Sequence, residues 1–275
     1  MKKFVKLAAV FMAAAMLLAL CACGSKPADD GKKTITLGTS ADYPPFEFHI
    51  LKDGKDEIVG IDVSMAKAIA AEMGAELQIK DIAFDSLLIE LGQGTVDFVI
   101  AAMEKDDTRD AAADFSDPYY TDYPPMILVK KENAEQYKTL ADFDGKAVGA
   151  QTGTTKADIV TNDMPGANLV ALQLVTDLVN QLMYDKVDAV VVEGSVANQY
   201  VAENDDFVIA EASSELGAAE PYCVAVQKGD PKGLLPGINE AIAKINSENK
   251  IEEFIALADS LSGVAEEVSA DAPAE

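Results

Sequence analysis

Apolar residues between positions 34 and 262 follow two patterns that alternate along the chain. Short apolar runs such as "TITLGT" (34–39) and "VDAVVVE" (187–193) are typical of buried strands. Segments such as "IDVSMAKAIAAEMG" (61–74) instead place apolar residues three and four positions apart, on one face of a helix. This alternation predicts an α/β fold with mainly parallel strands and helices on both faces of each sheet.

Two stretches of the chain repeat the same order of elements. Residues 87–104 ("LLIELGQGTVDFVIAAME") and 178–195 ("LVNQLMYDKVDAVVVEGS") each have the pattern of a helix, a turn and a buried strand. The repeat indicates two similar lobes, and a chain of 275 residues suits two lobes of about a hundred residues each. Because ligands of open α/β sheets bind beyond the carboxyl ends of strands, we expect a site at residues 101–104 and 193–195.

The only arginine in the sequence, Arg109, follows the first of these strand ends. Its planar guanidinium can bind a carboxylate with two parallel hydrogen bonds. Glu193 at the second strand end suits an ammonium group, so the two charges together match a zwitterion. The loop "QTGTT" (151–155) joins a strand to a helix, and its backbone N–H groups near Thr154 and Thr155 favour a negative ligand group.

Two aromatic residues are candidates for the walls of this site. Tyr43 follows the first strand in "ADYPPFEF", where two prolines restrict the loop, and Phe84 precedes the second predicted helix. Both residues are also compatible with positions in an apolar core. We interpret "PPFEF" (44–48) as a turn and His49 as an exposed loop residue.

The two charged candidates have structural interpretations that the sequence leaves open. Arg109 can form an ion pair with Asp106 or Asp114, and Glu193 can be a solvated helix cap. The ligand-binding interpretation gains weight because charged, aromatic and loop features fall together at the predicted strand ends.

The N-terminal residues resemble a bacterial lipoprotein signal. Lysines precede an apolar run over 7–20 that is too short for a comfortable membrane span, and the run ends in the lipobox-like "LCACGS" with Cys23 as the acceptor. We therefore predict a signal peptide over 1–22, lipidation of Cys23 and a flexible tether over 23–33. An uncleaved membrane anchor is the alternative.

Composition limits the classes of partner. The formal charge is −25, from 47 acidic and 22 basic residues, and no basic patch is visible, which argues against nucleic acid. With Cys23 lipidated, Cys223 has no disulfide partner, and its apolar run "YCVAV" predicts a core position. Residues 264–275 are predicted to form an acidic, disordered tail.

Several blocks of the sequence, taken in order, resemble the extracellular solute-binding proteins of polar amino-acid ABC transporters, the family of histidine-, glutamine- and arginine-binding proteins. The blocks are "GTSADYPPFEF", "IVGIDVSMAKAIAAEMG", "FDSLLIELGQGTVDFVIAAM", "DFSDPYY", "GKAVGAQTGTT" and "VDAVVVE". The resemblance implies a two-lobed, periplasmic-binding-protein-like α/β fold of type II, with mixed sheets and two crossing hinge strands near 122–128 and 217–223. It places lobe 1 at 34–122 and 223–263 and lobe 2 at 123–222.

The resemblance also implies ligand contacts, position by position. Arg109 occupies the position of the arginine that binds the ligand α-carboxylate. A backbone group of Ala102 and the hydroxyl and N–H of Thr155, with Thr154 adjacent, contact the same carboxylate. Glu193 stands where the family usually has an aspartate that binds the α-ammonium.

Around the rest of the ligand, Tyr43 and Phe84 occupy the flanking aromatic positions, and Ser40 and Gln151 lie near the ligand side chain. Glu104 departs from the family, because it replaces the small hydroxyl residue that normally donates to the carboxylate. Two like charges about 4 Å apart cost on the order of 4 kcal/mol at an effective dielectric of about 20. Glu104 must therefore turn toward a neighbouring cation or meet a cationic part of the ligand, and a Glu104→Thr change is expected to strengthen binding of neutral amino acids.

We expect a lipid-anchored, extracytoplasmic and monomeric binding protein, not an enzyme, without a cofactor or metal. It closes on a polar amino acid or related zwitterion and delivers it to an ABC permease. The acidity of the predicted pocket favours a basic amino acid. Two alternatives remain: a dehydratase that uses Glu104 and Glu193 as acid–base groups, and a ligand sensor.

Overall fold

The computed structural model describes residues 33–270, and two five-stranded sheets organise them. The first sheet has the order β5-β1-β6-β13-β7. Its strands are β1 (Lys33–Thr39), β5 (Ala75–Asp81), β6 (Phe98–Val99), β7 (Ala113–Thr121) and β13 (Pro221–Gln227). Strands β1 and β6 are parallel, whereas β13 is antiparallel to both of its neighbours. We call the part of the chain built on this sheet lobe 1.

Helices cover both faces of the first sheet because its central strand is apolar on both sides. Around it lie α2 (Ile61–Glu72), α3 (Leu87–Gln93), α4 (Asp107–Ala112), α8 (Leu235–Ser247) and α9 (Lys250–Ala270). In β6, Phe98 packs in the cluster that contains Met65 and Ile69 of α2, whereas Val99 packs in a second cluster with Leu91 of α3. Successive strand residues point to opposite faces, so two buried faces require a continuous apolar run.

The second sheet, on which lobe 2 is built, has the order β10-β9-β11-β8-β12. Its strands are β8 (Met126–Lys130), β9 (Ala147–Gln151), β10 (Asn168–Leu172), β11 (Ala189–Val192) and β12 (Phe207–Ile209). Strands β9, β10 and β11 run parallel, and β8 is antiparallel to β11 and to β12. Both sheets are therefore mixed, and the expectation of mainly parallel strands was wrong for β8 and β13, the first strand after each passage between the sheets.

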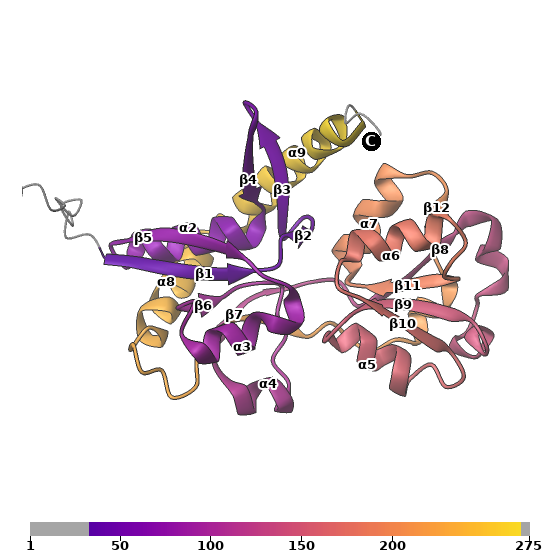
Figure 1. The fold of residues 1–275 in the computed structure, drawn as a ribbon, viewed down its shortest axis with the longest axis horizontal. Helices are drawn as coiled ribbons and strands as arrows, with labels where there is room; N and C mark the ends of the chain where they lie inside the picture. The colour runs from indigo at the N-terminus through magenta and orange to yellow at the C-terminus, as the bar shows by residue number, and fades with distance from the viewer. Residues whose placement is uncertain (1–32, 271–275) are drawn as a thin grey trace, which may run out of the picture. The chain divides into compact units, whose positions relative to one another are not determined.

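The helices of lobe 2 lie on opposite faces of its sheet (Figure 1). They are α5 (Thr155–Asn162), α6 (Val175–Met183) and α7 (Gly194–Glu203), and three short 3₁₀ helices, η3 (Lys131–Gln136), η4 (Leu140–Phe143) and η5 (Glu211–Glu215), complete the lobe. Val190 and Val192 of β11 pack with α6, whereas Val191 packs with α5. All four residues of β11 are buried, which explains why this strand has an uninterrupted apolar sequence.

A small antiparallel sheet, β2-β3-β4, was not predicted from the sequence. It comprises β2 (Asp42–Tyr43), β3 (Glu47–Lys52) and β4 (Lys55–Val59). The turn between β3 and β4 is Asp53-Gly54, with φ of 52° and 72°. Asp-Gly is the sequence signal for a two-residue hairpin, so the signal was present. The interpretation of "PPFEF" as a turn was wrong for its last two residues, which begin β3.

The chain passes from the first sheet to the second between Thr121 and Met126, and it returns between η5 and Pro221. At the first passage, Asp122 accepts a hydrogen bond from the N–H of Ser195 at 3.1 Å. The assignment of these segments as hinges remains a prediction.

The predictions for the two ends of the sequence can be compared with the structure only where residues are described. Helix α9 continues to Ala270, into the segment expected to be a disordered tail. Residues 264–270 contain alanine, glutamate and valine but no glycine or proline, so nothing in them stops a helix. Residues 1–32 and 271–275, including Cys23, lie outside the described part. No helix between residues 33 and 270 is long and apolar enough to cross a membrane.

Candidate ligand-binding site

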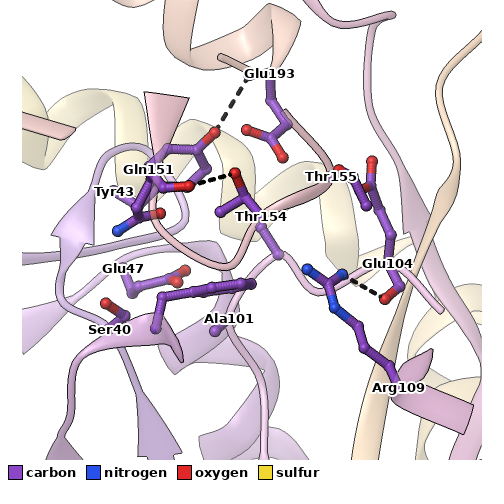
Figure 2. A pocket seen from close by; sticks show the side chains of 12 residues that line it. Ser40, Tyr43, Glu47, Ala101, Glu104, Arg109, Gln151, Thr154, Thr155 and Glu193 are labelled. Atoms are coloured by element: carbon purple, nitrogen blue, oxygen red, sulfur yellow. Dashed lines mark hydrogen bonds between the residues drawn. The ribbon is translucent and has the colours of Figure 1, made fainter. Parts of the chain in front are cut away.

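A small pocket lies where strands β1 and β6 of lobe 1 and strands β9 and β11 of lobe 2 end (Figure 2). Its cavity measures about 10 Å³, which is roughly the space of one water molecule. All ten predicted contact positions line it: Ser40, Tyr43, Phe84, Ala102, Glu104, Arg109, Gln151, Thr154, Thr155 and Glu193. Glu47 and Ala101 complete the lining.

The short helix α4 carries Arg109 into this pocket. Its N-cap residue, Asp106, accepts a hydrogen bond from the Arg109 N–H at 2.7 Å and lies 3.4 Å from Nε. Nη1 donates to the carbonyl oxygen of Glu104 at 2.7 Å, and Nη2 donates to the carbonyl oxygen of Gly153 in lobe 2 at 3.1 Å. Burial lowers the pKa of Arg109 and nearby carboxylates oppose the shift, so the guanidinium stays charged.

Two aromatic rings support the charged groups. The Arg109 guanidinium carbon lies 5.3 Å from the centroid of the Phe84 ring, within the range of a cation–π contact. The Tyr43 hydroxyl accepts a hydrogen bond from the Glu193 N–H at 3.2 Å. Tyr43 also packs in the apolar core, so it is both a core residue and a wall of the pocket.

A buried lysine that the sequence analysis missed, Lys156 in α5, joins the two acidic residues of the pocket. Its Nζ lies 2.7 Å from Glu104 Oε1 and also contacts Glu193 Oε1. The Thr155 hydroxyl donates to the other carboxylate oxygen of Glu104. The Glu104 side chain therefore points toward lobe 2, where the Lys156 ammonium compensates its charge.

Burial and ion pairing act in opposite directions on this cluster. Burial lowers the pKa of Lys156, and the charge of Glu104 opposes that shift. Burial raises the pKa of Glu193 to about 8, whereas direct contact with the Lys156 ammonium favours the ionised carboxylate. Because Lys156 contacts two carboxylates, we take all three side chains as charged.

Two predicted carboxylate contacts have their own hydrogen-bond partners. Thr154 is the N-cap of α5: its hydroxyl accepts from the Ala157 N–H at 3.3 Å and donates to the Gln151 carbonyl at 2.8 Å. The Ala102 N–H donates to Asp62 Oδ2 at 2.6 Å. Ala102 therefore offers a ligand only its carbonyl oxygen, an acceptor that suits an ammonium group rather than a carboxylate.

On the other side of the pocket, Glu47 is a buried carboxyl group without a cation (Figure 2). Among the described residues, its Oε2 has no hydrogen-bond partner. Asp62 at the start of α2 is also buried, and it accepts from the Tyr119 hydroxyl at 2.8 Å as well as from Ala102. Burial, followed by the charge of Asp62, raises the pKa of Glu47 well above its usual range, and burial raises the pKa of Asp62 to about 6.

Ser40 and Gln151, the predicted neighbours of the ligand side chain, are joined by Asp42. The Ser40 hydroxyl donates to Asp42 Oδ1 at 3.1 Å, and Gln151 Nε2 donates to Asp42 Oδ2 at 3.2 Å. The N–H of Val175 in lobe 2 also donates to Asp42, at 2.8 Å. These bonds connect the two lobes beside the pocket.

The sequence pattern that defines the bacterial extracellular solute-binding proteins, family 3, matches residues 35–256. This chain belongs to that family. The arginine-binding extracellular protein ArtP of Bacillus subtilis (strain 168) is 36% identical over 261 residues, which cover 92% of this chain and 96% of ArtP. The ABC transporter arginine-binding protein 1 of Escherichia coli (strain K12) is 30% identical over 225 residues, 80% of this chain and 88% of that protein.

Among solved structures, an amino acid ABC transporter substrate-binding protein from Streptococcus pneumoniae bound to L-arginine is similar, with a TM-score of 0.78 and 35% identity. The match covers 83% of this chain and 94% of that one. The resemblance noted in the sequence is thus confirmed: this family 3 protein has the two-lobed type II fold and binds an amino acid for an ABC transporter outside the cytoplasm.

The structural alternatives have different outcomes in this family 3 protein. Arg109 does form an ion pair with Asp106, at 3.4 Å, whereas Asp114 pairs with Lys228 at 2.8 Å. Glu193 occupies the N-cap position of α7, but its side chain makes no capping hydrogen bond and is buried.

His49 was expected to be an exposed loop residue, but it lies in β3. Its side chain is 40% exposed, and its ring nitrogens lie 2.9 Å from Asp56 and 3.2 Å from Asp81. Burial opposes protonation, but these two carboxylates outweigh it and raise the pKa of His49. No group of three or more histidine, cysteine or acidic side chains within residues 33–270 is placed to hold a metal ion.

Three residues of the family 3 site escaped the sequence analysis: Glu47, Asp62 and Lys156. Lys156 directly follows the "QTGTT" loop, and the uncompensated charge of Glu104 was a signal that a cation was missing. Glu47 was hidden in "PPFEF", where the prolines drew attention to a turn. Asp62 begins an apolar helix, and nothing local distinguishes it from a helix-starting acid.

Proposed function

We propose that this protein is a lipid-anchored receptor for a basic amino acid, with L-arginine as the first candidate, which it delivers to an ABC permease. In this proposal Arg109 binds the ligand carboxylate and Glu193 binds the α-ammonium. Glu47 receives the cationic end of the ligand side chain. The arginine-binding proteins among its relatives support this choice of ligand.

The observation that carries the choice of ligand is the Glu47 carboxyl group. It is 1% exposed, and one of its oxygens has no partner among the described residues. A buried carboxyl oxygen without a hydrogen-bond partner costs free energy unless a ligand supplies the missing donor. A guanidinium or ammonium group at the end of the ligand side chain would supply both donors and charge.

The charge balance of the pocket supports the same class. Arg109 and Lys156 supply two positive charges, whereas Glu104, Glu193 and Asp106, the ion-pair partner of Arg109, supply three negative charges. Glu47 and Asp62, if they share one proton, add one further negative charge. A basic amino acid, with a net charge of +1, reduces this negative charge, whereas a neutral amino acid does not.

Lipid anchoring and transport rest on the sequence. Cys23 in "LCACGS" would become the acylated N-terminus after removal of residues 1–22, and residues 23–33 would tether a monomer to the membrane. The permease would recognise the closed, ligand-bound lobes. The dehydratase alternative loses support, because Glu104 and Glu193 both hold Lys156 and because the matched relatives are transport proteins.

Calorimetric titration of the purified protein with L-arginine and L-citrulline tests the choice of ligand. Citrulline has nearly the same shape as arginine but an uncharged side-chain end, so it measures the contribution of that charge. We expect arginine to bind at least about a hundredfold more tightly, which is roughly 2.7 kcal/mol. Equal affinities, or tighter binding of citrulline, would refute the proposal of a basic ligand while leaving the family intact.

A further inference from the structure

Lys156 connects the two lobes from a position inside the pocket. It is 3% exposed, and its Nζ contacts Glu104 of lobe 1 at 2.7 Å and Glu193 of lobe 2. A weaker contact joins it to the Thr155 hydroxyl at 3.1 Å. One ammonium group therefore serves two carboxylates that come from opposite sides of the pocket.

In the proposed function, both carboxylates that contact Lys156 also lie next to charged groups of the ligand. Glu193 is the anchor for the ligand α-ammonium, and Glu104 lies where the ligand carboxylate is expected. If Lys156 stayed on Glu193, two ammonium groups would compete for one carboxylate. If Lys156 left Glu104, that glutamate would repel the ligand carboxylate. With Lys156 on Glu104 and the ligand ammonium on Glu193, each carboxylate has its own cation.

We propose that Lys156, which contacts both Glu104 and Glu193, is a movable counter-ion that passes wholly to Glu104 when a ligand ammonium binds Glu193. This inference rests on the proposed binding of an α-amino acid at Arg109 and Glu193. It makes Lys156 a positioning residue, because it acts on the ligand through the two glutamates. It also explains how a glutamate at position 104 is compatible with a ligand carboxylate.

The transfer needs no large movement. Lys156 already contacts both carboxylates, so a shift toward Glu104 breaks one contact and strengthens the other. The Thr155 hydroxyl holds the second oxygen of Glu104 and keeps that carboxylate directed at lobe 2. Because Glu104 and Lys156 belong to different lobes, the final arrangement forms only when the lobes are closed.

Four proteins and two ligands test this inference by calorimetry. The proteins are the wild type, Lys156→Gln, Glu104→Thr and the double variant. The ligands are L-arginine and agmatine, which is arginine without its α-carboxylate. Lys244→Gln is a matched control, because Lys244 forms an exposed ion pair with Glu72 outside the pocket.

The counter-ion role predicts a distinct pattern. Lys156→Gln leaves Glu104 unpaired, so the Kd for arginine should rise at least about tenfold while agmatine changes less than about threefold. Glu104→Thr leaves Lys156 on Glu193, so the affinity for both ligands should fall by about tenfold, the opposite of the effect expected from the sequence for neutral amino acids. The double variant has neither the unpaired Glu104 carboxylate nor a lysine on Glu193, so its Kd for arginine should lie within about threefold of the wild-type value.

Two results would overturn the inference. One is a double variant in which the affinity losses of the two single variants multiply, and the other is a Lys156→Gln variant that loses affinity for arginine and for agmatine equally. If Lys156→Gln does not fold, Glu104→Thr and the double variant still test it, because the second change must restore what the first removes. A wild-type protein that binds no amino acid would overturn both the inference and the proposed function. A wild-type protein that binds without coupling between positions 104 and 156 would overturn the inference alone.

Discussion

The two sides of the pocket differ in how their charges are balanced. On one side, Lys156 contacts the carboxylates of Glu104 and Glu193, and Arg109 pairs with Asp106, so each charge has an ion-pair partner. On the other, Glu47 and Asp62 are buried without an ion pair in the described part of the chain, and burial raises both pKa values. A balanced set suits the zwitterionic head that all α-amino acids share. Under the proposed function, the cationic end of a basic ligand completes this second side, which is therefore the side that distinguishes ligands.

The two sides also differ in which lobes build them. Arg109 reaches the Gly153 carbonyl, and Glu104 reaches Lys156, so the balanced side needs both lobes. Asp62 is held by Tyr119 and Ala102, both in lobe 1. Lobe 1 can therefore position the side-chain receptor before closure, whereas closure assembles the receptor for the head.

Substitutions on the balanced side should weaken arginine binding more than substitutions on the unbalanced side. Arg109→Lys keeps the charge but loses the two-pronged geometry that a carboxylate matches, so we expect arginine binding to weaken by about 2–3 kcal/mol, roughly a hundredfold. Calorimetric Kd values at constant pH and salt measure the effect. A change below about threefold would show that a point charge suffices, and it would end the role assigned to the guanidinium.

The unbalanced side should control selectivity more than affinity. Glu47→Gln keeps the shape but removes the charge, so the preference for arginine over citrulline should fall at least about tenfold, with citrulline itself little changed. The exposed Glu57 in the neighbouring strand β4 gives a matched control, Glu57→Gln. If the ratio survives in Glu47→Gln, another group recognises the side-chain cation.

The smallest expected effect is a dependence on pH. The carboxyl pair of Glu47 and Asp62 holds a proton that a bound cation would displace, because burial raises both pKa values. Arginine binding should therefore release less than one proton and tighten as pH rises from about 5 to about 7, by at most about tenfold per unit. Titrations in buffers of different ionisation enthalpy count the proton. Uptake of a proton, or a Kd independent of pH, would contradict the shared carboxyl proton.

The same raised pKa values act on stability in the opposite sense. Between about pH 4 and about pH 6 the folded ligand-free protein binds more protons than the unfolded chain, because unfolding returns Asp62 to its ordinary pKa. The contribution of Asp62 to the free energy of unfolding should therefore fall as pH rises through this window. Thermal unfolding of Asp62→Asn beside the wild type isolates that contribution.

The sequence was sufficient for the elements that carry strong local patterns. Helix α2 and strand β11 were predicted because periodicity and burial leave a direct record in the order of residues. The predicted contact residues meet in one pocket because the carboxyl ends of strands converge at one edge of a sheet. The small β2-β3-β4 sheet was missed, although Asp53-Gly54 marks its turn, because its polar residues resemble a loop.

What the sequence by itself determined is the family, the two-lobed α/β architecture and the need for a partner to the charge of Glu104. Only the tertiary structure decided which residue meets that need, because Glu104 and Lys156 lie 52 positions apart and belong to different lobes. It also decided that Glu47 and Asp62 are buried, with no ion pair to either within residues 33–270. Local order specifies helices and strands, but the balance of charge inside a closed pocket depends on distances between residues that the chain brings together only on folding.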